Sequence, residues 1–387
     1  MALPAGALAL ATLALAANAF AVARVPAAAA HRPMAPAPGW RLSKTISIRD
    51  GQVLMTGIDA VSDDDAWAVG SEFSGSGTPV GRPVLEHWDG ATWRRVTPPA
   101  KVARHVGGQD VLANVGVLSA DDVWAISFEG RYLRLLNHRW TFGQLPGSQG
   151  GKLAISTVKT FGPADVWAFG YRSVGRPSRL VFVPYAARFD GRRWTTIPVP
   201  GRGILGPVSA LSAHDIWAVI GVPFGVRGVP STARVLRWNG ARWMPVPVRP
   251  SLPKHASVVT ILATKDSNVW IGGGVPNTKG GTSEMARHWN GRAWISASPR
   301  SAATSQDFYL ASFVTDGRGG FWAIGGNLNL GPQRLWRHSG GRWSAPLRSP
   351  WQLYQLAAVP DSTSTWGVGL SADLFTGLIV LHGPVPR

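Results

Sequence analysis

Asp65-Ala66-Trp67-Ala68-Val69-Gly70 is the stretch of sequence that decides the fold, because it returns with small changes along the whole chain. It is followed by Trp88-Asp89-Gly90-Ala91-Thr92-Trp93, in which a second tryptophan is reached through an Asp-Gly dipeptide. Asp-Gly and Asn-Gly favour tight turns between antiparallel strands, because both central residues of such a turn need a positive φ. The unit is therefore predicted to consist of short strands joined by tight turns.

The two tryptophans of this unit recur at regular places. The first occurs seven times, at Trp67, Trp124, Trp167, Trp217, Trp270, Trp322 and Trp366. The second occurs six times, at Trp93, Trp140, Trp194, Trp243, Trp294 and Trp343. The chain ends where a seventh would stand, and Gly39-Trp40-Arg41-Leu42-Ser43 supplies a spare tryptophan segment at the N-terminal end. Self-similarity of this kind is the signature of a repeat fold.

The repeats predict an all-β fold, a seven-bladed β-propeller of four-stranded antiparallel blades. The N-terminal strand is expected to pair with the last blade, which would remove the free edges that an open sheet leaves. The first tryptophans are expected to pack between blades, since burying one aromatic side chain removes about 150 to 250 Å² from water. These tryptophans are therefore interpreted as structural residues and not as a stacking platform for a ligand.

Polar residues recur in the unit as well. We expect one repeat position to be filled by His87, His288, His338, His382, Arg188 and Arg237. A position that accepts arginine is not a metal-ligand position, so no metal site is predicted. An aspartate recurs in the first turn, where it is expected to bond its own backbone. Its copies are Asp65, Asp122, Asp165 and Asp215.

The blade resembles that of Kelch and galactose-oxidase-type propellers, on the strength of the glycine pairs Gly272-Gly273 and Gly325-Gly326 and of a tryptophan six residues after His87. The Asp-Gly-x-x-Trp turn is also similar to the Asp-box of sialidase-like propellers, with one residue fewer between Asp and Trp. The galactose-oxidase resemblance would imply a Cys-Tyr cofactor, which a chain without cysteine cannot form. No cofactor is therefore predicted.

Residues 1–30 are predicted to be a signal peptide or an N-terminal hydrophobic segment, with an apolar stretch from Ala5 to Val22. No basic residue precedes Arg24, so an uncleaved membrane anchor is the alternative. Residues 31–39 are a Pro-rich spacer and residues 40–387 a single propeller domain. We expect an exported protein, extracellular or in the cell envelope, that touches a membrane only if this segment is uncleaved.

The formal net charge is +18, which raises the question of an anionic partner. The basic residues are scattered and form no arm or basic helix, so a dispersed solvated surface is the simpler interpretation and nucleic acid is not an expected partner. The sequence also contains no phosphate-binding glycine loop, no nucleophile elbow and no calcium loop.

A candidate binding face follows from the order of the strands. Successive turns of a meander alternate between two faces, so the long second-to-third loops and the blade-to-blade loops should share one face. Fifteen residues before each first tryptophan stand residues that are never aliphatic and that differ between adjacent blades after the first pair. They should ring the channel mouth on that face. They are Gln52, Gln109, Lys152, Arg202, His255, Asp307 and Trp351.

The candidate ligand-binding residues are Lys152, Arg202, His255, Asp307, Tyr309 and Trp351. We expect a non-catalytic monomeric binding protein that engages an extracellular polymer, such as an anionic carbohydrate, or a protein through this face. The alternative is a polysaccharide hydrolase or lyase with its site at the channel mouth, with Asp307 as acid or base and Tyr309 nearby.

Overall fold

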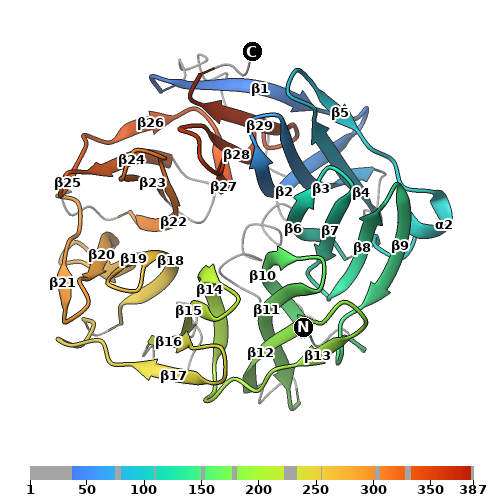
Figure 1. The fold of residues 1–387 in the computed structure, drawn as a ribbon. Coiled ribbons are helices and arrows are strands. Elements are labelled where there is room, and N and C mark those ends of the chain that lie inside the picture. The colour runs from blue at the N-terminus through green and yellow to red at the C-terminus, as the bar shows by residue number, and fades with distance from the viewer. Residues whose placement is uncertain are drawn as a thin grey trace.

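The computed structural model describes residues 37–74, 80–108, 110–149, 153–176, 181–221, 233–253, 255–300, 306–326 and 333–384. Seven antiparallel sheets succeed one another around a centre, as Figure 1 shows, so the protein is a seven-bladed β-propeller. The predicted signal peptide at residues 1–30 and most of the spacer lie outside the described residues. No helix among the described residues has the length and apolar character needed to cross a membrane.

In blades 1 to 6 the strands run from innermost to outermost in chain order, and blade 7 takes its outermost strand from the N-terminal end of the chain. Blade 1 has β2 (Gly51–Ser62), β3 (Asp65–Ser74), β4 (Val80–Trp88) and β5 (Trp93–Arg95). Blade 2 has β6 (Leu112–Ser119), β7 (Asp122–Ser127), β8 (Arg131–Leu136) and β9 (Arg139–Gln144). Blade 3 has β10 (Leu153–Gly162), β11 (Asp165–Val174), β12 (Val181–Phe189) and β13 (Trp194–Thr196). A short helix, α2 (Ala100–Ala103), connects the first two blades.

The remaining blades follow the same plan. Blade 4 has β14 (Ile204–Ser212), β15 (Asp215–Gly221), β16 (Arg234–Trp238) and β17 (Trp243–Val246). Blade 5 has β18 (Ser257–Lys265), β19 (Asn268–Pro276), β20 (Thr282–Trp289) and β21 (Trp294–Ser296). Blade 6 has β22 (Tyr309–Thr315), β23 (Phe321–Gly326), β24 (Gln333–Ser339) and β25 (Arg342–Trp343), and β26 (Leu347–Ser349) also pairs with β24. Blade 7 has β27 (Gln352–Ala358), β28 (Thr365–Leu370), β29 (Gly377–His382) and, from the other end of the chain, β1 (Trp40–Ile46).

The predicted ring closure is present. Strand β1 pairs antiparallel with β29, from Trp40 opposite His382 to Ile46 opposite Gly377. The Lys44 ammonium then reaches blade 1, where it lies 2.7 Å from Glu86 Oε2 and donates to the Trp93 carbonyl at 2.8 Å. The N-terminal strand therefore completes the last blade and ties it to the first.

The first tryptophans pack between blades, as predicted. Each of the seven is at most 6% exposed. Trp67 of blade 1 lies in a buried cluster with Val115 and Val123 of blade 2, and Trp217 of blade 4 lies with Ile261 of blade 5. The ring closes in the same way, because Trp366 of blade 7 packs with residues of blade 1. Each inter-blade seam thus has one of these tryptophans in its core.

The glycine at the end of the Trp-Ala-Val-Gly strand has a structural cause. The innermost strand carries a register shift in every blade, between Met55 and Gly57 in blade 1. This shift brings the Leu54 carbonyl against Gly70, where a Cβ atom would overlap the oxygen. In blade 3 the Ala154 carbonyl lies against Gly170 in the same way. Only glycine allows so close an approach of two backbones.

The expectation that the recurring aspartates bond their own turn is wrong. Asp215 lies 2.8 Å from the Arg237 guanidinium on the neighbouring strand, and Asp165 pairs with Arg188 at 2.7 Å. Asp65 and His87 form the same pair in blade 1 at 2.9 Å. A serine hydroxyl bonds the backbone of the first turn instead. In blade 1, Ser62 Oγ accepts a hydrogen bond from the Asp64 amide. The carboxylate turns toward the neighbouring strand because a cationic side chain lies there.

The cation of this pair also covers the tryptophan. The Arg237 guanidinium lies 5.2 Å from the Trp217 ring centroid, and the His87 ring stacks on Trp67 at 4.6 Å. Arginine and imidazole both offer a donor to the aspartate and a flat face to the indole. This double contact explains why the repeat position alternates between the two residue types.

The alignment of the histidines is partly wrong. His87 and His288 lie opposite Trp67 and Trp270, as expected. His338 instead lies opposite Phe321, and Arg337 takes the position opposite Trp322 and pairs with Asp316 at 2.7 Å. His382 is displaced in the same way, opposite Thr365. His87 stands six residues before Trp93, whereas His338 stands only five residues before Trp343, and Arg337 is the residue six before it. The spacing from the second tryptophan therefore assigns the repeat position to Arg337.

Candidate functional site

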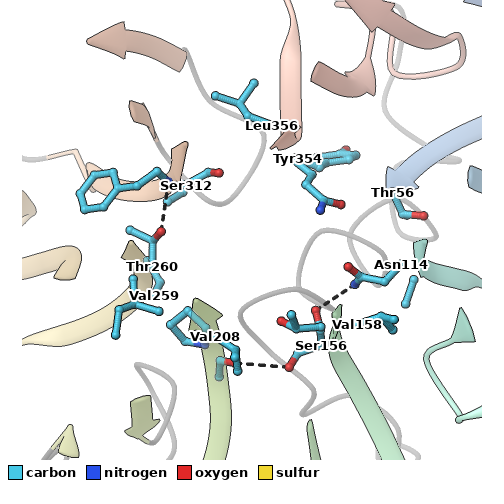
Figure 2. Close-up of a pocket in the computed structure, with 18 of the residues that line it drawn as sticks. Thr56, Asn114, Ser156, Val158, Val208, Val259, Thr260, Ser312, Tyr354 and Leu356 are labelled. Atoms are coloured by element: carbon cyan, nitrogen blue, oxygen red, sulfur yellow. Dashed lines mark hydrogen bonds between the residues drawn. The ribbon is translucent and has the colours of Figure 1, made fainter. Parts of the chain in front are cut away.

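A cavity of about 620 Å³ lies at the centre of the ring, and the innermost strands line it. Figure 2 shows side chains from several blades converging on it. Much of the wall is apolar because the residue nine places before each first tryptophan faces it in most blades, as with Ile58, Val158, Val208 and Phe313. This volume is in the range of small-ligand pockets, about 300 to 1,000 Å³.

The polar side chains of the wall bond the next blade. Thr56 Oγ1 donates to the Leu112 carbonyl at 2.6 Å, and Asn114 Nδ2 donates to the Ser156 carbonyl at 2.8 Å. Thr260 Oγ1 accepts from the Phe313 amide at 3.1 Å (Figure 2). Gln355 Oε1 accepts from an amide of blade 1 at 3.3 Å. These bonds form a belt around the channel that holds the blades in register.

Two charged residues line the cavity among the described residues, Asp59 and Lys159. Both stand eight residues before a first tryptophan, toward the tight-turn end of the innermost strand. Asp59 Oδ2 accepts from the Val117 amide at 3.0 Å. Burial raises the pKa of the Asp59 carboxyl, while the Lys159 charge and the Val117 amide act to lower it.

Sequence reasoning missed this pair, although a signal was present. The equivalent residues of blades 2, 4, 5 and 6 are Gly116, Ser209, Leu262 and Val314, none of them charged. A charged residue at a repeat position that is otherwise small or apolar is the feature that marks Asp59 and Lys159.

The two faces of the ring differ as expected. On one face the turn before the first tryptophan touches the Asp-Gly or Asn-Gly turn of the same blade in blades 1, 3, 4 and 5, as where Gly191 lies against Ala164. The second-to-third loops and the blade-to-blade connections lie at the other ends of the strands, on the long-loop face. Parts of these loops lie outside the described residues, including 75–79, 177–180 and 222–232.

Of the predicted site residues, Lys152 lies outside the described residues, as does Gln109 of the same ring. Arg202 and His255 are exposed on the long-loop face, and His255 has a positive φ of 62°. Asp307 is partly buried and forms a backbone bridge with Thr282 at the start of β20.

Tyr309 and Trp351 are buried, with 5% and 8% of their surface exposed. The Tyr309 hydroxyl lies 3.3 Å from Thr282 Oγ1, and burial raises the pKa of this phenol. Trp351 packs with Trp40 and Leu353 in the core between blades 6 and 7. None of the five described candidates lines the central cavity. Their role in binding stays a prediction.

The structure places further arginines beside Arg202. The Arg234 guanidinium donates to the Arg202 carbonyl at 3.2 Å, and the Gly203 amide donates to the Phe182 carbonyl at 2.9 Å. Phe182 lies opposite Ser173, next to Arg172. Arg172, Arg202 and Arg234, together with Arg176 three residues from Ser173, are all exposed. None of these four pairs with a carboxylate among the described residues.

We call these four exposed residues, Arg172, Arg176, Arg202 and Arg234, the arginine rim. Arg202 and Arg234 lie where blades 3 and 4 meet on the long-loop face, and Arg172 lies on the other side of blade 3, against Gly147 of the connection from blade 2. No group of three or more His, Cys, Asp or Glu residues suited to a metal ion occurs in the described part of the chain.

Comparisons with known proteins show similarity of fold and do not identify a function. No protein-family model matches the sequence, and no curated protein matches it. The structure is similar to that of YCF48 bound to a D1 peptide, with a TM-score of 0.57, 12% identity and coverage of 91% of this chain and 99% of that one. It is also similar to YCF48 from Cyanidioschyzon merolae, with a TM-score of 0.56, 15% identity and coverage of 89% and 98%.

An enzyme shares the architecture too. The GH74 xyloglucanase from Xanthomonas campestris matches with a TM-score of 0.52 and 16% identity, over 86% of this chain and 54% of that one. At these identities the likeness shows the propeller fold alone. Propellers host unrelated activities, so function has to be argued from the site.

Proposed function

We propose that this chain is an exported, non-catalytic binding protein that engages an extracellular anionic polymer through its long-loop face. The observation that carries the proposal is the arginine rim, four exposed arginines of blades 3 and 4 that pair with no carboxylate in the described part of the chain. Guanidinium groups bind carboxylate and sulfate groups in a planar, two-pronged geometry. An anionic polysaccharide presents such groups at repeated intervals and can contact several of these arginines at once.

The construction of the channel supports binding over catalysis. Thr56, Asn114, Thr260 and Gln355 already bond neighbouring blades, so their polar groups serve the ring. Hydrolysis of a glycoside commonly uses two carboxyl groups about 5 to 10 Å apart. Asp59 is the one carboxylate among the described residues that line the cavity.

Binding to a protein is the second candidate occupant of the same face. YCF48, which has the same fold, is a propeller that was found with a bound peptide. For this chain an acidic peptide would meet the same arginines.

We further propose that the blades are of the Kelch or galactose-oxidase type, on the ground of the close backbone approach at Gly273 and Gly325.

The test is binding of the purified protein to polygalacturonate, a uronic acid polymer, with neutral dextran as the reference probe. Replacing Arg172, Arg202 and Arg234 together with alanine is expected to weaken polygalacturonate binding at least about tenfold, or 1.4 kcal/mol. Raised salt should weaken binding to the unaltered protein, because exposed charges are screened within about 8 to 10 Å.

The matched control replaces Arg192, Arg242 and Arg292 with alanine. These arginines are also exposed and lie in the tight turns of the opposite face, so the net charge changes equally. Equal losses in the two triple variants would mean that the basic charge acts diffusely and would contradict the proposal. Cleavage of the polymer would favour the hydrolase or lyase reading instead.

A further inference from the structure

Two side chains of opposite charge, Asp59 and Lys159, line the central cavity without forming an ion pair with each other. Asp59 projects from blade 1 and Lys159 from blade 3, and both line the cavity. Their charges interact, yet no ion pair or hydrogen bond joins them. The equivalent residue of the blade between them is Gly116, against which the side chains of Thr160 and Val158 pack.

The two charges also differ in how they are held. Asp59 is fixed by the Val117 amide, so its carboxylate has one defined place on the wall. Lys159 makes no hydrogen bond and no ion pair with any described residue, and its three donors are available to a ligand. Beside them the cavity wall is apolar, with Ile58, Val158 and Val208 at neighbouring positions.

We propose that the central cavity binds a small zwitterion with an apolar body, such as an amino acid with an aliphatic or aromatic side chain. The ligand's ammonium group lies at Asp59 and its carboxylate at Lys159. A ligand with only one of these charges would leave one wall charge without its partner in a desolvated site, which costs free energy. The apolar wall accepts the rest of the molecule, and about 620 Å³ leaves room for it.

This site goes beyond the proposed function, because it lies inside the channel and takes a small molecule, whereas the arginine rim is on the outer face. The tight-turn mouth is the nearer entrance to Asp59 and Lys159, which stand three residues from the ends of β2 and β10. A polymer bound at the long-loop face would therefore leave this entrance uncovered.

The experiment measures binding by isothermal titration calorimetry with three probes, L-leucine, N-acetyl-L-leucine and L-leucinamide. The first carries both charges, the second only the negative charge and the third only the positive charge. We expect L-leucine to bind and each blocked derivative to bind at least about tenfold more weakly, a difference of 1.4 kcal/mol. L-phenylalanine serves as a second zwitterion with a larger apolar body.

Variants of the two residues should separate the charges. Lys159→Met keeps the length of the side chain and is expected to weaken L-leucine at least about tenfold while leaving L-leucinamide unchanged. Asp59→Asn keeps an oxygen for the Val117 amide and should weaken L-leucine while leaving N-acetyl-L-leucine unchanged. Lys265→Met removes the same charge from an exposed surface position and should change nothing.

Three results would overturn the proposal. They are a failure of both zwitterions to bind at millimolar concentration, equal binding of L-leucine and N-acetyl-L-leucine, or unchanged L-leucine binding in Lys159→Met. Should Asp59→Asn fail to fold, the three probes on the unaltered protein decide by themselves. Polygalacturonate binding by Lys159→Met keeps the two proposals apart, because loss of the cavity site is expected to leave the arginine rim intact.

Discussion

At the scale of the residue, the first tryptophan of each repeat carries the most packing energy. Trp217 is 1% exposed and fills the seam between blades 4 and 5. Trp217→Ala is expected to lower the free energy of unfolding by about 3 to 5 kcal/mol, as large-to-small core changes do. Chemical denaturation measures this loss. The control is Ile295→Ala, at a residue that is 48% exposed. A loss of ligand binding without a loss of stability in Trp217→Ala would contradict the packing role.

The Asp-cation pair can be tested with the substitution that the repeat itself uses. Arg237 donates to both oxygens of Asp215 at 2.8 Å and covers Trp217. In blade 1, His87 likewise contacts Asp65 and stacks on Trp67. Arg237→His is therefore expected to cost less than Arg237→Met, which leaves Asp215 without its donor and should cost about 1 to 3 kcal/mol. Thermal melting of both variants provides the comparison.

The control for this pair is Arg193→Met, which removes an exposed contact of 4.0 Å to Asp190 and is expected to leave the melting temperature nearly unchanged. If Arg237→His were as damaging as Arg237→Met, the equivalence of the histidine and arginine positions would be refuted.

At the scale of the element, β1 decides whether the ring is closed. It supplies the outermost strand of blade 7, and Trp40 packs on Trp322 with ring centroids 5.5 Å apart. Deleting residues up to Ile46 is expected to unfold or aggregate the protein, because β29 would lose its outer partner and become an unprotected edge. Deleting residues up to Pro36 should leave the melting curve unchanged. A stable protein without β1 would show that closure does not depend on it.

The contact of β1 with blade 1 is a second test of closure. The Glu86 carboxylate is 2% exposed, with the Lys44 ammonium at 2.7 Å and the Arg95 guanidinium at 3.9 Å. Lys44→Met leaves a buried carboxylate with the more distant partner alone and is expected to cost about 1 to 3 kcal/mol. Adding Glu86→Gln should recover part of that loss, since the buried charge is then gone. An unchanged melting temperature in Lys44→Met would argue against the contact.

At the scale of the whole molecule, two buried groups give the fold an opposed response to acid. Burial, with Arg318, Arg337 and Arg41 nearby, lowers the pKa of His382 from 6.5 to about 4. The unfolded chain binds this proton more readily, so stability is lost as the pH falls from about 6.5 toward 4. Burial raises the pKa of Asp110 from 3.8 to about 6, so this carboxyl adds stability as the pH falls through that window.

We expect the fall in melting temperature between pH 7 and pH 4.5 to be smaller in His382→Gln than in the unaltered protein, and larger in Asp110→Asn. His382 packs against Trp40 and Trp322 at the closing strand, so its protonation acts on the seam between the chain ends. Thermal scans at the two pH values test both variants. Identical pH profiles for all three proteins would show that neither group titrates in this range.

Most of the fold could be predicted from the sequence, because its signals are local and repeated. Tight-turn dipeptides, a tryptophan at the same place in each unit and a spare strand before the first repeat lead to seven blades and to the pairing of β1 with β29. The inter-blade packing of the tryptophans followed from burial alone. The alignment of the histidines was one residue out for His338 and His382, which stand one place after the residue that pairs with the first tryptophan.

The candidate sites depend on the tertiary structure. Asp59 and Lys159 are one hundred residues apart in the chain and meet only because the ring brings blades 1 and 3 to one cavity. The arginine rim is likewise spread over two blades, and Tyr309 and Trp351, which were predicted to face a ligand, proved buried. The sequence by itself determined the repeated unit, its count and its closure, since each rests on contacts within a blade or between equivalent positions. Only the tertiary structure decided which unlike residues share a wall, because that depends on the closure of the whole ring.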